Sequence, residues 1–324
     1  MNILKTKKLS LFFLQCISIL VSILIAISVF PMDIVNASGD EIEVWDGTKA
    51  SNFAGGEGTK ENPWLIENAS QLYKVVAEYC SKDKSFGKYF KITKDIYIND
   101  VTDGTPVQNL AGKRNWLEEL GKSITAPTTS NRLYFHGTLD GDNHTVYGLY
   151  AKATSSLSLG LFPAIANGTT VKNLSFDNLF LTGGNGSGGA IAGYANWAGL
   201  SASTYPANIT NCSVVNATIG ENKNIKNAGG FVGNMSNSTI SFANCYVYNS
   251  NFSATNEGGV VASASKSEAK LTVVNSYAID YFPLNVALNK ISYTNVYTNT
   301  TSATGVYNTG VTVLTPDQMK GENA

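Results

Sequence analysis

The two histidines of this 324-residue chain lie close together, on either side of two aspartates. The segment reads His136-Gly-Thr-Leu-Asp140-Gly-Asp142-Asn-His144. Imidazole and carboxylate groups at this spacing could serve as a general acid and base, or could bind a metal ion. The competing interpretation is turn chemistry, because Asp and Asn beside a glycine hydrogen-bond their own backbone. Two aspartates two residues apart are weak evidence for calcium, so we expect a turn with no catalytic residue, metal or cofactor.

No other catalytic signature stands out. The zinc-protease helix pattern, the serine nucleophile elbow and the phosphate-binding loop are absent from the sequence. The four cysteines are Cys16, Cys80, Cys212 and Cys245, too few for a disulfide scaffold. The chemistry of the chain must therefore depend on how repeated elements position polar and aromatic groups.

Three stretches share one eight-residue pattern, with Asn as the third and eighth residue: Val171–Asn178, Ile209–Asn216 and Phe242–Asn249. A run of two glycines and apolar residues follows each copy, at Gly188–Gly193, Gly229–Gly233 and Gly258–Ala262. A repeat of about 30 to 40 residues with β-branched strands is typical of a stacked β-solenoid. Three short strands per turn and rungs about 4.8 Å apart would make a three-sided column.

The first Asn of each copy is predicted to form a structural ladder. These residues are Asn173, Asn211, Asn244 and Asn275, with Asn295 opening a degenerate copy. Asn tolerates left-handed backbone angles, and its amide can bond to the Asn one rung above. We expect the side chains of Asn173, Asn211 and Asn244 to be buried at a corner and bonded to backbone or to one another.

Cys212 and Cys245 belong to the same ladder, one position after the Asn, where the side chain should point inward. A disulfide between rungs is one alternative, and two stacked buried thiols are the other. The next position, two after the Asn, should point outward and is Tyr246, Tyr277 and Tyr297 in the last copies. These tyrosines either form a ligand-binding strip for sugar rings or a partner protein, or a self-stacking ladder that stabilises the sheet.

The conjunction of motifs resembles the bacterial GLUG family. Gly188–Tyr194 and Gly229–Asn234 are similar to its Gly-Gly-Leu-Val-Gly-Tyr motif, and Gly58–Ile66 and Phe135–Val146 are similar to the segments that precede it. The resemblance implies an all-β, right-handed parallel β-helix on a secreted or cell-surface bacterial protein, with adhesion as the usual function and no catalytic residues. The third copy lacks the closing glycine and the copies after Tyr277 are degenerate, so we expect less regular final rungs.

The N-terminus has the features of a secretory signal peptide (1–37). Lys5, Lys7 and Lys8 precede an apolar run, Leu9–Phe30, and small residues end at Ala37. The run is nearly long enough to span a bilayer, so an uncleaved signal anchor is the alternative, and the one expected membrane contact. Cleavage would remove three basic and one acidic residue and shift the net charge from −1 to −3, which makes nucleic acid a poor partner.

The rest of the chain divides into three parts. Residues 38–132 are predicted to be a cap region with an amphipathic helix that begins at Asn68 or Ser70. Residues 133–300 are predicted to form the β-helix. Residues 301–324 resemble the start of a linker, with truncation of a longer protein left open.

These observations favour a non-enzymatic, secreted or cell-surface β-solenoid, an adhesin-like module that contacts glycan or protein. One alternative is a polysaccharide lyase or glycosidase, which would need paired carboxylates facing one groove. The acidic residues of the repeats occupy different repeat positions: Asp177, Glu221, Glu257, Glu268 and Asp280. A structural spacer is the third alternative.

Overall fold

The computed structural model describes residues 42–80, 84–117, 133–196, 205–265, 269–281, 283, 290–300, 310–315 and 318. The predicted signal segment (1–37) and most of the predicted linker (301–324) lie outside the described residues. From Glu43 onward, the described part of the chain belongs to a single unit.

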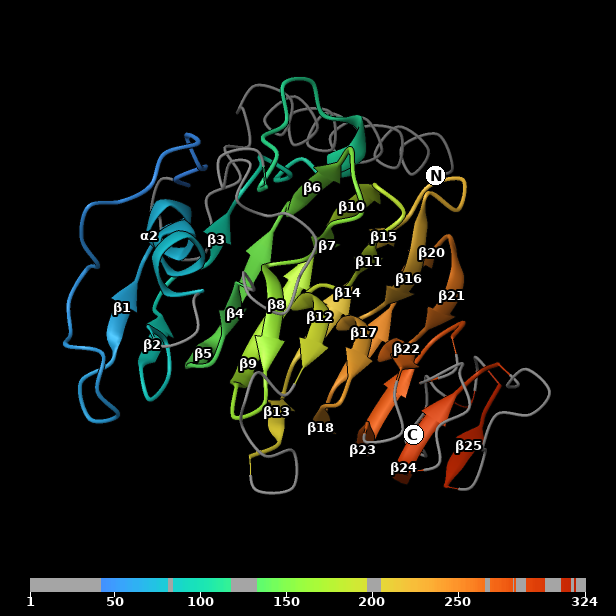
Figure 1. Cartoon of the computed structure of the whole chain (residues 1–324). Helices are drawn as coiled ribbons and strands as arrows, with labels where there is room; N and C mark the ends of the chain where they lie inside the picture. The colour runs from blue at the N-terminus through green and yellow to red at the C-terminus, as the bar shows by residue number, and fades with distance from the viewer. Residues whose placement is uncertain are drawn as a thin grey trace, which may run out of the picture. The chain divides into compact units, whose positions relative to one another are not determined.

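Four parallel sheets make up this unit (Figure 1). Sheet A contains β1 (Trp64–Ile66), β2 (Tyr89–Ile92), β3 (Ile96–Tyr97), β5 (Thr138–Tyr147), β9 (Thr170–Asp177), β13 (Ala207–Thr210), β14 (Ser213–Val215), β18 (Thr239–Ala243), β19 (Tyr246–Tyr248), β23 (Lys270–Ala278), β24 (Ile291–Thr298) and β25 (Val311–Val313). Sheet B contains β4 (Tyr134–Phe135), β8 (Phe162–Ala166), β12 (Ala192–Asn196), β17 (Val232–Ser236) and β22 (Val261–Ser265). Sheet C contains β6 (Tyr150–Ala153), β10 (Phe180–Gly183), β15 (Thr218–Ile219) and β20 (Asn251–Phe252). Sheet D contains β7 (Ser158–Leu159), β11 (Ser187–Gly188), β16 (Ile225–Gly229) and β21 (Ala254–Gly258).

The chain visits the sheets in the order A, C, D, B and then returns to A one rung further on. Starting from β5, four complete coils follow this path, and every strand pairs with the equivalent strand of the neighbouring coil. The predicted parallel β-helix is therefore confirmed. Each coil contributes to four sheets, one more than the three strands expected per turn. A tight turn separates sheets C and D, where Gly183 adopts a φ of 89° that favours glycine.

The Asn ladder bends sheet A into two arms. Asn173, Asn211, Asn244, Asn275 and Asn295 all have left-handed φ values between 48° and 55°. Each Nδ2 donates to the Oδ1 of the preceding Asn, at distances of 2.9, 3.0, 3.3 and 3.0 Å from Asn211 to Asn295. Asn173 donates at 2.9 Å to the carboxylate of Asp140, which ends the ladder. The expected burial is wrong for Asn211 and Asn244, which are exposed like Asn275 and Asn295, because the convex side of a bend faces solvent.

A second ladder follows the second arm of sheet A. Asn249 donates to Asn216 at 2.5 Å, and Asn216 donates to Asp177 at 2.7 Å. The repeat would place Asn178 at the end of this ladder, but its amide binds the backbone of Thr105 and Val107 instead. A third ladder in sheet D, which no sequence motif indicated, joins three side chains: Asn256, Asn227 and Ser187.

The core is the inward-facing side of these rungs. Leu174, Cys212 and Cys245 follow the ladder Asn residues and are at most 2% exposed. Beside them Phe176, Val214 and Val247 are in register with one another and fully buried. Burial of each such side chain contributes about 1.5 to 3 kcal/mol.

Cys212 and Cys245 are free thiols, which removes the disulfide alternative. The sulfur atoms donate to backbone carbonyls, at 3.3 Å to Thr210 and 3.3 Å to Ala243 respectively. Burial raises the pKa of the Cys212 thiol. The pair therefore acts as small apolar core residues that place their hydrogens on the carbonyls beside the bend.

The runs of two glycines form the passage from sheet D to sheet B. Gly193 closes the first run, and a Cβ there would lie 2.3 Å from the carbonyl oxygen of Ser187. The third run has Ala262 in place of the closing glycine, yet β22 keeps regular pairing with β17. Beyond it the described strands of sheet A continue through β24 and β25.

The predicted cap is present at the N-terminal end of the stack (Figure 1). Helix α2 (Ala69–Lys74) begins at Asn68, whose side chain accepts from the backbone N–H of Gln71 at 3.0 Å, and it continues as a π-helical turn, η1 (Val75–Tyr79). Leu72, Val75 and Val76 are at most 1% exposed and join the core. A short 3₁₀ turn, η2 (Val107–Asn109), follows in the next loop.

We predict that the Asn ladder stabilises the fold. Asn211→Ala should lower the free energy of unfolding by about 2 kcal/mol, because two amide hydrogen bonds disappear and alanine must adopt a left-handed φ. Urea denaturation followed by circular dichroism measures this change. Asn222→Ala is the matched control, since Asn222 has a φ of 52° in an exposed turn outside the ladders. Equal losses in the two variants would contradict a stabilising role for the amide bonds.

Candidate ligand-binding surface

The second arm of sheet A carries a column of hydroxyl and aromatic side chains on its outer face. Strand register places the members side by side: Ser175, Ser213, Tyr246, Tyr277 and Tyr297. The residue before each member is at most 2% exposed: Leu174, Cys212, Cys245, Ser276 and Val296. Strand alternation therefore turns the three tyrosines outward on consecutive rungs. We name Tyr246, Tyr277 and Tyr297 the tyrosine strip.

Two of the three rings of the tyrosine strip, Tyr246 and Tyr277, stack on one another. The ring centroids of Tyr246 and Tyr277 are 5.1 Å apart, and the planes differ by 10°. Tyr277 keeps 36% of its surface exposed. Stacking covers ring faces, so ring edges and hydroxyl groups face solvent. This geometry supports the self-stacking ladder and leaves an amphipathic outer edge that a partner can contact.

Tyr248 extends this surface and was not singled out in the sequence. It lies two residues after Tyr246 in β19 and is 48% exposed. Burial raises the pKa of Tyr277, and the neighbouring Tyr246 and Tyr248 add to the effect. The alternation of aromatic residues in Tyr246-Val-Tyr248 is the signal that could have identified it.

A second aromatic pair lies on the same arm near the cap. Tyr97 and Tyr147 are in register, with ring centroids 4.7 Å apart and planes 11° apart. Between the two aromatic groups, the Ser213 hydroxyl donates to the Ser175 hydroxyl at 2.8 Å. Tyr147 pairs with Asp177, so this second aromatic pair belongs to the column of Asp177, Val215 and Tyr248, next to the column of the tyrosine strip.

The two histidines are not brought together. His136 is 4% exposed, and its ring centroid lies 6.3 Å from that of Phe86 and 6.2 Å from that of Tyr134. His144 lies at the surface, with Nδ1 3.3 Å from a carboxylate oxygen of Asp95. One ring belongs to the interior and the other contacts Asp95 at the surface, which does not match a shared acid and base site.

The two aspartates serve the bend. The backbone N–H of Asp142 donates to the Asp140 carboxylate at 3.0 Å, which is the expected turn chemistry. Each carboxylate also has its own cation, with Lys172 2.8 Å from Asp140 and Lys91 2.9 Å from Asp142. The bend lies within one continuous strand, β5.

Within the described ranges, no group of three or more His, Cys, Asp or Glu side chains is arranged to hold a metal ion. The helices of that same part of the chain are all too short or too polar to cross a membrane. The apolar run Leu9–Phe30 lies outside the described residues.

No family model matches the chain. It is 32% identical over 133 residues to a "Putative Gly-rich membrane protein" of Evansella cellulosilytica, which covers 41% of this chain and 13% of that protein. It is 26% identical over 151 residues to "Halomucin" of Haloquadratum walsbyi, which covers 47% of this chain and 2% of that protein. The chain thus spans a small fraction of either relative.

Among solved structures, the crystal structure of a "putative immunoglobulin A1 protease from Bacteroides ovatus" aligns with a TM-score of 0.48 and 17% identity. The alignment covers 82% of this chain and 88% of that chain.

We predict that Asp140 contributes to acid sensitivity. Partial burial acts to raise its pKa, but hydrogen bonds from Lys172 and Asn173 outweigh it and hold the pKa below the usual 3.8. As pH falls, the unfolded chain binds the proton first, so the stabilisation is complete above about pH 5 and is lost as pH falls through the folded pKa.

In the Asp140→Asn variant, the free energy of unfolding should therefore fall less with decreasing pH than in the unchanged protein. At pH 7 the variant should be less stable by under about 1 kcal/mol. Urea midpoints measured from pH 7 to pH 3 check this. Lys172→Met should flatten the acid dependence in the same direction, because it removes one of the hydrogen bonds. Parallel pH profiles in all three proteins would rule out the contribution.

Proposed function

We propose that this protein is a non-enzymatic β-solenoid of the cell surface or the extracellular medium that binds an extended glycan along the outer face of sheet A. The observation that carries the proposal is the tyrosine strip, in which aromatic side chains on consecutive rungs face solvent. A flat parallel sheet offers a long contact surface, and rungs about 4.8 Å apart let one extended polymer touch several side chains.

The chemistry of this face fits a saccharide. Ring edges supply apolar contact, and the phenol groups supply hydrogen bonds to hydroxyl groups. The exposed Tyr248 widens the surface beside Tyr246. The column itself contains hydroxyl and aromatic side chains and no charged residue, so an uncharged or weakly charged polymer suits it best.

The surface location rests on separate observations. Residues 1–37 have the pattern of a secretory signal, and the runs of two glycines resemble the GLUG motif of secreted and cell-surface proteins. The two relatives are called a membrane protein and a halomucin. These features support export.

The alternatives make different demands on the same surface. A lyase or glycosidase would need carboxylates that converge on the bound sugar. Asp140 and Asp142 instead lie opposite separate lysines at the bend of sheet A. A spacer would need no accessible aromatic surface at all.

The test is retention of the protein on a panel of immobilised neutral and acidic polysaccharides. Tyr246→Ser with Tyr277→Ser should abolish retention, because it removes the stacked rings. Serine is chosen because Ser175 and Ser213 occupy the same column and pair at 2.8 Å. The variant should therefore keep its circular dichroism spectrum. Its free energy of unfolding, from urea denaturation, should stay within about 1 kcal/mol of that of the unchanged protein.

Tyr205→Ser is the matched control, since Tyr205 is 47% exposed and lies before β13, outside the strip. It should be retained like the unchanged protein. Equal retention of the double serine variant would dismiss the tyrosine strip as a binding face. Release of sugar fragments from the panel would favour the enzyme, and no retention of any protein would favour the spacer.

A further inference from the structure

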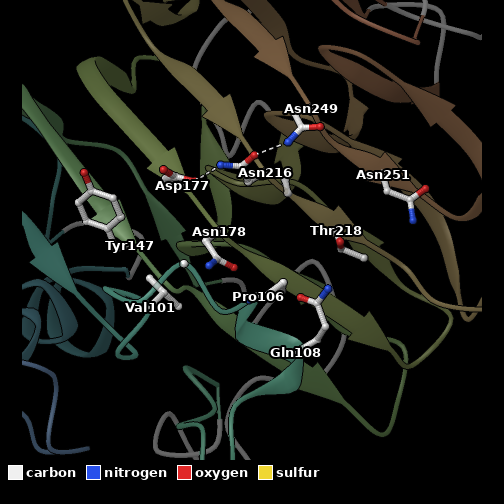
Figure 2. A pocket seen from close by; sticks show the side chains of 12 residues that line it. Val101, Pro106, Gln108, Tyr147, Asp177, Asn178, Asn216, Thr218, Asn249 and Asn251 are labelled. Atoms are coloured by element: carbon white, nitrogen blue, oxygen red, sulfur yellow. Dashed lines mark hydrogen bonds between the residues drawn. The ribbon is translucent and has the colours of Figure 1, made fainter. Parts of the chain in front are cut away.

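A polar groove of about 420 Å³ lies at the second corner of sheet A (Figure 2). Its lining residue Asn249 follows Tyr246 of the tyrosine strip by three residues. One side is the second Asn ladder, whose Asn249 directly follows the exposed Tyr248. The opposite side is the loop of residues 99–117, which contributes Pro106 and Gln108. The floor is the outer face of sheet C at Thr218 and Asn251. This volume falls within the usual range of small-molecule sites.

The loop side of the groove is held in place by hydrogen bonds at several points. Asn178 donates to the Thr105 carbonyl and accepts from the Val107 N–H, both at 2.8 Å. Further along, Asn99 donates to the Gly148 carbonyl at 2.8 Å, and Trp116 donates to the Leu161 carbonyl at 3.0 Å. A ligand therefore meets a preformed surface and does not have to order the loop.

The outer face of sheet C, which forms the floor of the groove, changes from aromatic to polar side chains along the stack of rungs. Tyr150, Phe180, Thr218 and Asn251 follow one another in register on its outer face. The loop covers the two aromatic members, and Val107 packs with them in a small apolar cluster. Thr218 and Asn251 lie beyond the edge of the loop and remain open. The groove is the step between the covered and the uncovered rungs.

The groups that face the groove have unused hydrogen-bonding capacity. The side chains of Gln108, Thr218 and Asn251 have no hydrogen-bond partner among the residues that the structure describes. An amide offers both donors and an acceptor, which matches the paired hydroxyl groups of a sugar. Asp177 is the one charged residue among the groove-lining residues, and its carboxylate disfavours anions.

We propose that this groove is a second binding site, which takes uncharged pyranose units of a neutral saccharide through Gln108, Thr218 and Asn251. The inference deepens the proposed function and rests on it, because the groove adjoins the tyrosine strip across the Asn216–Asn249 ladder. The strip supplies apolar contact with an extended chain, and the groove supplies the hydrogen bonds that distinguish one sugar from another.

The test is calorimetric titration of the protein with soluble neutral oligosaccharides (cellohexaose, maltohexaose and chitohexaose) and with acidic oligogalacturonate. The double variant Gln108→Ala, Asn251→Ala should lower the affinity for the tightest-binding neutral oligosaccharide by about tenfold or more, since two amides that bond to the sugar are lost. Thr218→Phe should do the same by filling the groove, and Phe180 in the same column shows that this position accepts the ring. Asn109→Ala, on the same loop but outside the groove, should bind normally.

The outcomes separate the two binding faces. Unchanged affinity in both groove variants, with binding lost in the double serine variant of the strip, overturns the groove and leaves the proposed function intact. Loss of binding in the groove variants, with normal binding by the strip variant, overturns the tyrosine strip as a binding face and supports the groove. Binding of oligogalacturonate in preference to every neutral ligand overturns the assignment to uncharged sugars. Failure of the unchanged protein to bind any of the four probes overturns both.

Discussion

The hydrogen bond between stacked Asn amides at the bends of sheet A is the interaction on which the rest of the structure depends. A left-handed residue must occur at each bend of sheet A for the strand to turn, and Asn adopts that conformation at little cost. Its amide can both donate and accept, so each interior Asn of the ladder is bonded on both sides by its neighbours. The register of every coil follows from this alignment, and with it the division between core and surface residues.

The ladders also have a direction and a defined end. Every amide donates toward the N-terminal coil, so the first position of a ladder must accept without donating. A carboxylate meets that need, and Asp140 and Asp177 occupy these positions in the two ladders of sheet A. Charge-assisted hydrogen bonds are stronger than neutral ones, and aligned amides polarise one another. The aspartates are therefore part of the architecture, which gives Asp140 a structural role four residues from either histidine.

Surface chemistry in this fold is set column by column. Outward positions on neighbouring rungs come into contact, so similar residues at one repeat position form a continuous stripe. The tyrosine strip arises in this way on sheet A, and the aromatic pair Tyr150 and Phe180 arises in the same way on sheet C. The first stripe is left open and the second is covered by the loop of residues 99–117. The polar groove exists because that loop ends where the column on sheet C becomes polar.

The sequence by itself determined the solenoid, the Asn bends and the inward and outward faces, because these depend on local backbone conformation and on alternation along each strand. The positions of Asn211, Cys212 and Tyr246 could be assigned from spacing alone. The exposure of the ladder, the fourth sheet and the parallel stacking of the Tyr246 and Tyr277 rings depend on how rungs pack. Asp177, and not Asn178, ends the second ladder because Asn178 bonds to a loop some 70 residues earlier in the chain, and the groove depends on the same loop. Only the tertiary structure decided these features, since no local pattern records which distant segment an outward-facing residue will meet.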